Sequence, residues 1–221
     1  MTIIQKLYYL VLAIAFISGV VRHKKLTTPF RILTYSLLAT IILEIFARFL
    51  GTKFKNNALA FHLMSLNGYV FYSFIYYFLF ISSRLKKSIL VSIFLVVIFF
   101  FVNIFFIQQP YHKQFPTNIY LVTNALLVIW SLLLFKQMLQ YSLSINIIRQ
   151  SIFWFNTAIL FFSSTMSLSM EMLNYYAKLN WGYDIVYYLW VGEFCLFNFL
   201  ILIALLLDNK EKSSRIWAPT T

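Results

Sequence analysis

The chain has few of the residues that build covalent or metal-bound scaffolds. Its 221 residues include one cysteine, Cys195, and three histidines. A single cysteine excludes an intrachain disulfide and a metal site made of cysteines. We therefore expect Cys195, which lies in an apolar stretch, to be a small packing residue.

Acidic residues are also scarce. Six Asp and Glu stand against 18 Lys and Arg, which gives a net charge of +12, yet only 11% of the chain is charged. Such a balance is common in nucleic-acid-binding proteins, where the basic residues gather on one face. Here they form short clusters at the ends of apolar runs, which is typical of topology-setting charges beside anionic headgroups. We predict no nucleic-acid partner.

Apolar residues are abundant instead, at 62% of the chain with 25 Phe. Soluble domains rarely exceed about half. Runs of about 20 apolar residues recur along the chain, and this is the length that crosses a hydrocarbon layer. Because lipid offers the backbone no hydrogen-bond partner, each run must be a helix. The sequence predicts an all-α, polytopic membrane protein with the lipid bilayer as its surroundings.

Seven transmembrane helices are predicted, forming one domain with a short tail at 208–221. The expected ranges are approximately 3–21, 32–50, 59–82, 88–107, 117–139, 152–173 and 185–207. All four prolines fall outside these ranges, so we expect no span with a proline kink. The connections leave no room for a soluble domain.

Positive charge is unequal between the two sets of connections. Twelve basic residues fall on one side, namely Arg22, Lys24, Lys25, Arg31, Arg84, Lys86, Lys87, Lys136, Arg149, Lys210, Lys212 and Arg215. Six fall on the other, namely Lys6, Arg48, Lys53, Lys55, Lys113 and Lys178. The positive-inside rule then places the N-terminus outside and the C-terminus in the cytoplasm.

The stretch ATIILEIFARF at 39–49 puts Glu44 and Arg48 inside an apolar run. Glu44 lies roughly 20 Å along the outward-running second helix, in the outer half of the bilayer. Arg48 follows one turn later, where an i,i+4 pair can meet on one face. A salt bridge near the interface is one explanation of this pair.

Other polar residues share that outer half. His62 and Tyr69 lie on one face of the third helix with Asn67 off that line, Glu171 ends a serine stripe in the sixth, and Glu193 lies roughly 13 Å into the seventh. Ionisable residues within spans usually face a bundle interior or a wet cavity, although polar stripes also mediate helix packing. We predict one outward-facing ligand-binding cavity formed by Glu44, Arg48, His62, Asn67, Tyr69, Glu171 and Glu193.

Two cofactor-dependent classes are disfavoured. A retinal protein needs a Schiff-base lysine in its last helix, and no lysine lies between Lys178 and Lys210. A zinc site needs several ligands together, but the predicted topology separates His23 from His62 and His112. We expect no metal, no cofactor and no assigned catalytic residue.

Three functions stay open. A non-enzymatic receptor-like sensor subunit would use the outward pocket and pass its signal to a separate partner. A small-solute transporter fits the length but would need hinged helices near the midplane. A metal-free intramembrane lipid hydrolase would need two carboxylates acting as acid and base.

Three segments carry a resemblance to a known group of proteins. ILEIFARF in the second helix, NNALAFHLMSLNGYVFYSFIYY leading into the third, and IFWFNTAILFF opening the sixth resemble small seven-helix inner-membrane proteins of the Bacteroidetes type. That resemblance implies a multi-pass protein of the bacterial inner membrane with a sensory or signalling role beside a separate histidine kinase or another signalling protein. It implies no catalytic residues.

Overall fold

The computed structural model describes residues 3–108, 116–141, 147–179 and 183–210. Within these residues, seven helices are long and apolar enough to cross a membrane, which confirms the predicted all-α fold with seven apolar spans. Their bounds are α1 Ile3–Val21, α2 Thr28–Phe54, α3 Ala58–Leu79, α4 Ser83–Val102, α5 Thr117–Tyr141, α6 Ser151–Leu179 and α7 Tyr183–Leu207.

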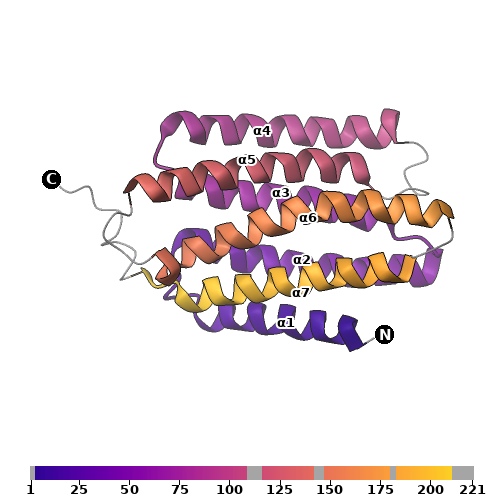
Figure 1. Cartoon of the computed structure of the whole chain (residues 1–221), viewed down its shortest axis with the longest axis horizontal. Helices are drawn as coiled ribbons and strands as arrows, with labels where there is room; N and C mark the ends of the chain where they lie inside the picture. Colours follow the sequence, from indigo (N-terminus) through magenta and orange to yellow (C-terminus); the bar gives the residue numbers. More distant parts are fainter. Residues whose placement is uncertain (1–2, 109–115, 142–146, 180–182, 211–221) are drawn as a thin grey trace.

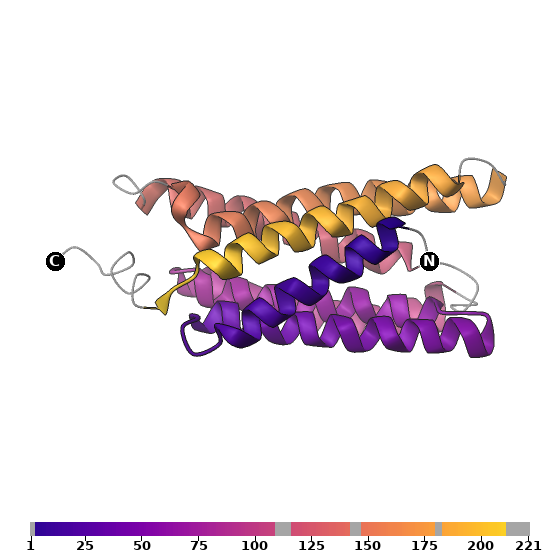
Figure 2. The ribbon, with the colours of Figure 1, turned by 90° about the horizontal axis from the view of Figure 1, so that it is seen from below.

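The seven helices run roughly along one axis, and the start of α1 and the end of α7 lie at opposite ends of the bundle (Figure 1). We call the end where α1 begins the N-terminal end. Seen from below, α1 slants from the layer of α6 and α7 toward the layer of α2 (Figure 2). Gly19 of α1 packs closely on Thr34 of α2 near the far end. At the N-terminal end, Gln5 of α1 hydrogen-bonds Tyr187 of α7.

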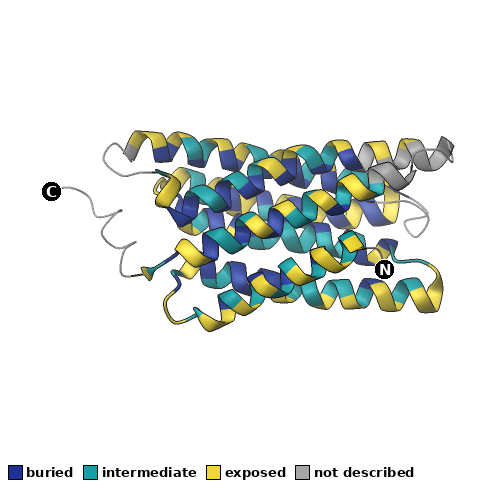
Figure 3. Cartoon of the chain, turned by 60° about the horizontal axis from the view of Figure 1, so that its bottom comes forward, coloured by how far each residue is buried: buried dark blue, intermediate teal, exposed yellow. Residues whose placement is uncertain are grey.

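Large apolar side chains cover the outside of the bundle as well as its core. Phe94, Phe106 and Leu168 are 66%, 80% and 69% exposed, and exposed positions recur along each helix (Figure 3). A water-soluble protein rarely exposes so continuous an apolar surface, whereas lipid tails accept it without cost. The exterior therefore matches a membrane-embedded bundle.

The prediction that no proline lies in a span is wrong for Pro29. Helix α2 begins at Thr28, earlier than the predicted residue 32, and Pro29 lies in its first turn. Proline is tolerated there because its missing N–H would have no helical partner and its fixed φ suits a helix start. At the other end, Lys55 ends α2 in the left-handed conformation with φ 56°.

The fourth span ends in a π-helical turn, Asn103–Ile107, which periodicity did not reveal. Asn103, the first residue of this turn, is fully buried, and its side-chain amide donates a hydrogen bond to the Gln108 side chain at 3.0 Å. The side-chain amide of Asn118 in α5 donates to the side-chain Oδ1 of Asn103 at 3.1 Å. This widened turn fastens the end of α4 to the start of α5.

A buried carboxylate ties together the end opposite the N-terminal end. Asp208, directly after α7, accepts hydrogen bonds from the backbone N–H of Thr27 at 2.7 Å and from the hydroxyl of Ser151 at 3.1 Å. Arg22 donates to the Asp208 backbone carbonyl at 2.9 Å. Burial raises the pKa of Asp208, and the hydrogen bonds and the Arg22 charge offset part of this rise. One side chain thus joins the starts of α2 and α6 to the end of α7.

Candidate functional site

Two adjacent cavities that share lining residues occupy the N-terminal half of the bundle. The mouth chamber, about 290 Å³, is lined by Gln5, Tyr8, Tyr9, Glu44, Ala47, Arg48, Asn57, Phe61, Tyr187, Trp190, Val191 and Phe194. The deep chamber, about 80 Å³, is lined by Tyr8, Leu37, Thr40, Glu44, Met64, Ser65, Gly68, Tyr69, Tyr72, Tyr120, Thr123, Asn124, Leu127, Phe162, Phe194, Phe197 and Asn198. Tyr8, Glu44 and Phe194 border both chambers. Together the chambers reach the lower end of the roughly 300–1,000 Å³ found for small-molecule pockets.

Glu44 is the acidic side chain at the junction of the chambers. Its Oε1 accepts a hydrogen bond from the Tyr8 hydroxyl at 2.9 Å, and its Oε2 accepts one from the Tyr9 hydroxyl at 3.0 Å. The Arg48 guanidinium lies 4.2 Å from the centre of the Tyr9 ring, a cation–π contact. The two tyrosines therefore hold the carboxylate in place from α1, while Arg48 lies one turn nearer the mouth.

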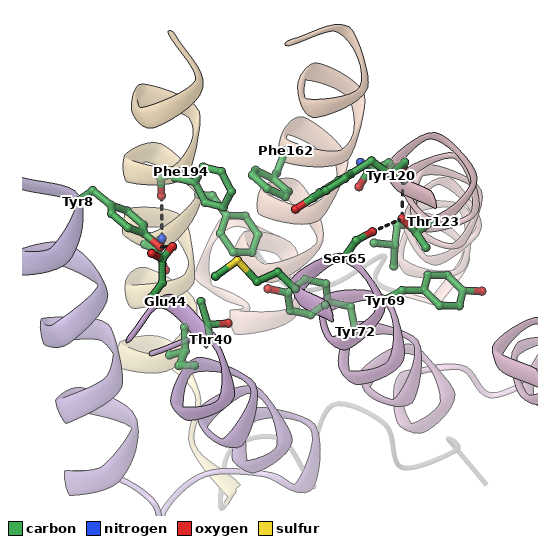
Figure 4. A pocket seen from close by; sticks show the side chains of 17 residues that line it. Tyr8, Thr40, Glu44, Ser65, Tyr69, Tyr72, Tyr120, Thr123, Phe162 and Phe194 are labelled. Atoms are coloured by element: carbon green, nitrogen blue, oxygen red, sulfur yellow. Dashed lines mark hydrogen bonds between the residues drawn. The ribbon is translucent and has the colours of Figure 1, made fainter. Parts of the chain in front are cut away.

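The deep chamber has aromatic walls and a few polar groups. Glu44 and Tyr8 lie on one side of it, and Tyr120 and Thr123 of α5 lie on the other (Figure 4). Ser65 of α3 hydrogen-bonds Thr123 at 3.2 Å. Asn124 is 4% exposed, and its side-chain Nδ2 has no hydrogen-bond acceptor among the described residues. That amide is a donor available to a guest in the chamber.

A layer of buried aromatic rings lies below the deep chamber, toward the opposite end. Phe155 of α6 packs against Phe30 of α2 and against Tyr72 and Tyr76 of α3, with ring centres 5.7–6.4 Å apart. Tyr76 donates a hydrogen bond to Asn156 at 2.8 Å, and Asn156 in turn donates to the Ser131 carbonyl of α5 at 3.0 Å. Because Phe30, Tyr76 and Phe155 are at most 1% exposed, this layer separates the chamber from the opposite end.

Three of the predicted site residues line the chambers. Glu44 borders both, Arg48 lies in the mouth chamber, and Tyr69 lies in the deep chamber. The Tyr69 hydroxyl is engaged outward, since it donates a hydrogen bond to Ser92 of α4 at 2.7 Å. Tyr69 therefore offers its ring to the chamber, while its hydroxyl joins α3 to α4.

The structure does not place the other described residues of the predicted site among those that line the chambers. His62 is fully buried in α3, and neither His62 nor Asn67 is among the residues that line the chambers. Glu193 lines a separate groove between α6 and α7 and accepts a hydrogen bond from Ser169 at 2.6 Å. Glu171 belongs to α6, but its side chain lies outside the described part of the structure.

The separation of Glu193 from Glu44 has a geometric cause. The groove around Glu193 also contains Leu168 and Leu189, which are 69% and 56% exposed on the outer surface of the bundle. Depth along a helix axis follows from counting residues, and that part of the prediction needs no contacts. The direction in which a side chain points depends on how each helix is rotated in the bundle, and apolar residues on every face hide that rotation.

Sequence reasoning missed Tyr8, Tyr9 and Trp190. The available signal was the pair of tyrosines in LYYL, two hydroxyls inside an otherwise aliphatic segment. Buried hydroxyls need partners, and a carboxylate on a neighbouring span is the strongest acceptor the chain could supply. Trp190 lines the mouth chamber, and its indole N–H is buried without an acceptor among the described residues.

The chambers present charged, polar and aromatic groups to their interior. It offers one carboxylate, one guanidinium, two unengaged N–H donors and several aromatic faces. Among the described residues, no group of three His, Cys, Asp or Glu could hold a metal ion. Comparison with protein-family models, with curated proteins and with solved structures gives no significant match.

Proposed function

We propose that this protein is a non-enzymatic, receptor-like membrane subunit that binds a small molecule from outside through the mouth and deep chambers. Positive charge is concentrated at the opposite end of the bundle, which supports an N-terminal end facing outward. The observation that carries the proposal is the Glu44 carboxylate, held by Tyr8 and Tyr9 where the two chambers meet. The proposal is therefore supported by the cavity around Glu44, and it does not depend on several acidic residues meeting in one site.

The aromatic layer around Phe155 favours binding over transport. A transporter of small polar solutes needs polar groups along its path on both sides of the substrate site. Below the deep chamber, the rings of Phe30, Tyr76 and Phe155 pack together and are almost fully buried. A solute could cross only if this packing came apart.

The chambers also argue against an acid–base hydrolase. Such a mechanism needs two carboxyl groups facing one substrate. Glu44 is the acidic residue among those that line the chambers, while Glu193 lies in the separate groove between α6 and α7. A lipid hydrolase therefore lacks its second group at this site.

We propose that the signal leaves through the opposite end, in the bacterial inner membrane, to a separate histidine kinase or another signalling protein. Asp208 there joins α2, α6 and α7, and each of these helices also lines a chamber. A ligand that shifts α2 against α7 would therefore act on the contacts of Asp208. This gives a physical route from the pocket to a partner.

Blocking the mouth chamber tests the proposal. Ala47 is 5% exposed and lines the chamber, whereas Ile45 on the same helix is 64% exposed on the outer surface. Ala47→Trp should fill the chamber, and Ile45→Trp is the matched control. A dialysable extract of growth medium should raise the melting temperature of the wild-type protein and of Ile45→Trp in nanodiscs, but not that of Ala47→Trp. Accumulation of a solute in proteoliposomes, or its chemical conversion, would contradict the proposal.

A further inference from the structure

We infer that the ligand is a small zwitterionic amine with an apolar side chain, of the kind represented by a free aliphatic amino acid. This inference rests on the proposed function and names the chemical class of its ligand. Three features at different depths of the chambers carry it: a carboxylate at the junction, cationic and N–H donors in the mouth chamber, and an apolar deep chamber.

The junction selects a positive charge. Glu44 borders both chambers, and each of its oxygens accepts one tyrosine hydroxyl. A carboxylate oxygen has two lone pairs, so each can accept a second hydrogen bond. An ammonium group supplies such donors and the opposite charge. The rings of Tyr8 and Phe194, which border the same junction, add aromatic faces beside it.

The mouth chamber selects a negative charge. Arg48 lies in this chamber, one helical turn closer to the end of α2 than Glu44. Its guanidinium lies over the Tyr9 ring. Trp190 lines the same chamber, and its buried indole N–H has no acceptor among the described residues. A carboxylate would accept a hydrogen bond from the Trp190 N–H, which is a donor only, and would carry the charge opposite to that of Arg48. A simple organic cation would leave the Trp190 N–H without an acceptor and would lie near the charge of Arg48.

The deep chamber selects an apolar group of modest size. Leu37, Leu127, Phe162 and Phe197 give it a mainly apolar wall, and its volume is about 80 Å³. The Asn124 amide on the same wall keeps a buried N–H that an aliphatic side chain does not satisfy. An aliphatic side chain of three or four carbons suits that space better than a long acyl chain. In an α-amino acid, the ammonium, the carboxylate and the side chain leave one carbon in three directions. This arrangement matches a junction bordered by Glu44, a donor-rich mouth and an apolar interior.

Four soluble probes dissect the three features in turn. L-Leucine carries all three groups, 3-methylbutylamine lacks the carboxylate, 4-methylpentanoate lacks the ammonium, and L-serine lacks the apolar side chain. Binding to the full chain in nanodiscs would be measured by titration calorimetry. L-Leucine should bind at least about tenfold more tightly than each of the other three, because a lost charged hydrogen bond or a lost apolar contact typically costs that much.

Matched variants connect each group of the probe to its residue. Glu44→Gln should weaken L-leucine and 3-methylbutylamine and leave 4-methylpentanoate unchanged, with Glu193→Gln in the separate groove as control. Arg48→Gln should weaken L-leucine and 4-methylpentanoate and leave the amine unchanged, with Lys53→Gln, an exposed cation on the same helix, as control. Four variants with melting temperatures near that of the wild type show that each loss is local.

The outcomes separate this inference from the proposed function. Binding of 3-methylbutylamine or of 4-methylpentanoate as tight as that of L-leucine overturns the zwitterion while leaving a pocket that binds small molecules. Binding of none of the four probes also overturns it, and the Ala47→Trp comparison then decides the proposed function independently. Equal binding of L-leucine by the wild type and by Glu44→Gln overturns the role of the junction.

Discussion

At the scale of single residues, Glu44 and its two tyrosines explain why an apolar run keeps a carboxylate. A charge inside a span costs roughly 2.5–3.5 kcal/mol on insertion scales. Tyr8 and Tyr9 reduce this cost by donating hydrogen bonds to both oxygens. The partners come from α1, a helix more than thirty positions earlier in the chain. The sequence placed Glu44 and Arg48 in one half of the bilayer, but it gave no information on which helix faces them.

A double-mutant cycle tests this pairing. Tyr8→Phe should lower the free energy of unfolding by about 1 kcal/mol, because the ring stays buried and one hydrogen bond is lost. In the Glu44→Gln background the same change should cost less, giving a coupling of about 0.5–2 kcal/mol. Detergent-induced unfolding in mixed micelles supplies the values. Tyr188→Phe, at an exposed position of α7, should show no coupling to Glu44, and strictly additive effects of Tyr8 and Glu44 would contradict the pairing.

The raised pKa of Asp208 leads us to predict that the stability of the protein depends on pH. Burial raises the pKa of this carboxyl group in the folded protein, so the folded state keeps the proton to a higher pH than the unfolded state, whose pKa is about 4. The stabilising contribution is complete below about pH 4 and is lost as the pH rises through the raised pKa. We expect the unfolding free energy of the wild type to fall over that interval.

Asp208→Asn isolates this effect, because the amide oxygen can still accept the Thr27 N–H but does not titrate. The difference in unfolding free energy between wild type and Asp208→Asn should shift with rising pH in favour of the variant. Unfolding in micelles at a series of pH values from 4 to 7 measures it. Parallel pH profiles of the two proteins would show that burial does not raise this pKa.

At the scale of elements, seven spans could be predicted because length and apolarity alone define them. The start of α2 could not, since Pro29 lies in the first turn of the helix here instead of preceding it. The π-helical turn Asn103–Ile107 was also not predicted. Hydrogen bonds to Asn118 and Gln108 stabilise it, and these two residues lie outside the periodic pattern of the fourth span. Tertiary hydrogen bonds, rather than local preference, determine such features.

The contact between α1 and α2 depends on a glycine. A Cβ added to Gly19 would lie 2.5 Å from the Thr34 Oγ1 and 2.9 Å from its Cγ2. Thr34 is 2% exposed and donates to the Phe30 carbonyl at 3.0 Å, so it has little freedom to move. Gly19→Ala should lower the free energy of unfolding by about 1–3 kcal/mol, as measured by detergent-induced unfolding.

Two further variants make the Gly19 prediction specific. Adding Thr34→Ala should recover most of the loss, because it removes the atoms that clash. Gly192→Ala on α7 is the control, since a Cβ there meets no atom within 4 Å, and it should be neutral or stabilising by up to about 1 kcal/mol. If Gly19→Ala were as harmless as Gly192→Ala, the close packing of α1 on α2 would be disproved.

At the scale of the whole molecule, the bundle is sorted along its axis. The chambers occupy the N-terminal half, the aromatic layer around Phe155 lies below them, and Asp208 ties the opposite end. The sequence predicted that Glu44 and Arg48 share one half of the bilayer, because depth follows from the 1.5 Å rise of a helix. It did not predict that Glu193 belongs to a different face of the bundle.

The central claim is that the chamber bordered by Glu44 opens to the outside, and thiol accessibility tests it most directly. The chain has one native cysteine, so Cys195→Ser provides a cysteine-free background for single reporters. Ala47→Cys places a thiol in the mouth chamber, Ile45→Cys places one on the lipid-facing surface, and Lys25→Cys places one at the opposite end. A charged, membrane-impermeant methanethiosulfonate is then added to intact bacterial cells expressing each variant.

We expect the reagent to modify Ala47→Cys in intact cells, to leave Ile45→Cys unmodified because lipid excludes the charge, and to reach Lys25→Cys only after the membrane is permeabilised. Modification of Lys25→Cys in intact cells, with Ala47→Cys protected until permeabilisation, would reverse the orientation and contradict the outward-facing pocket.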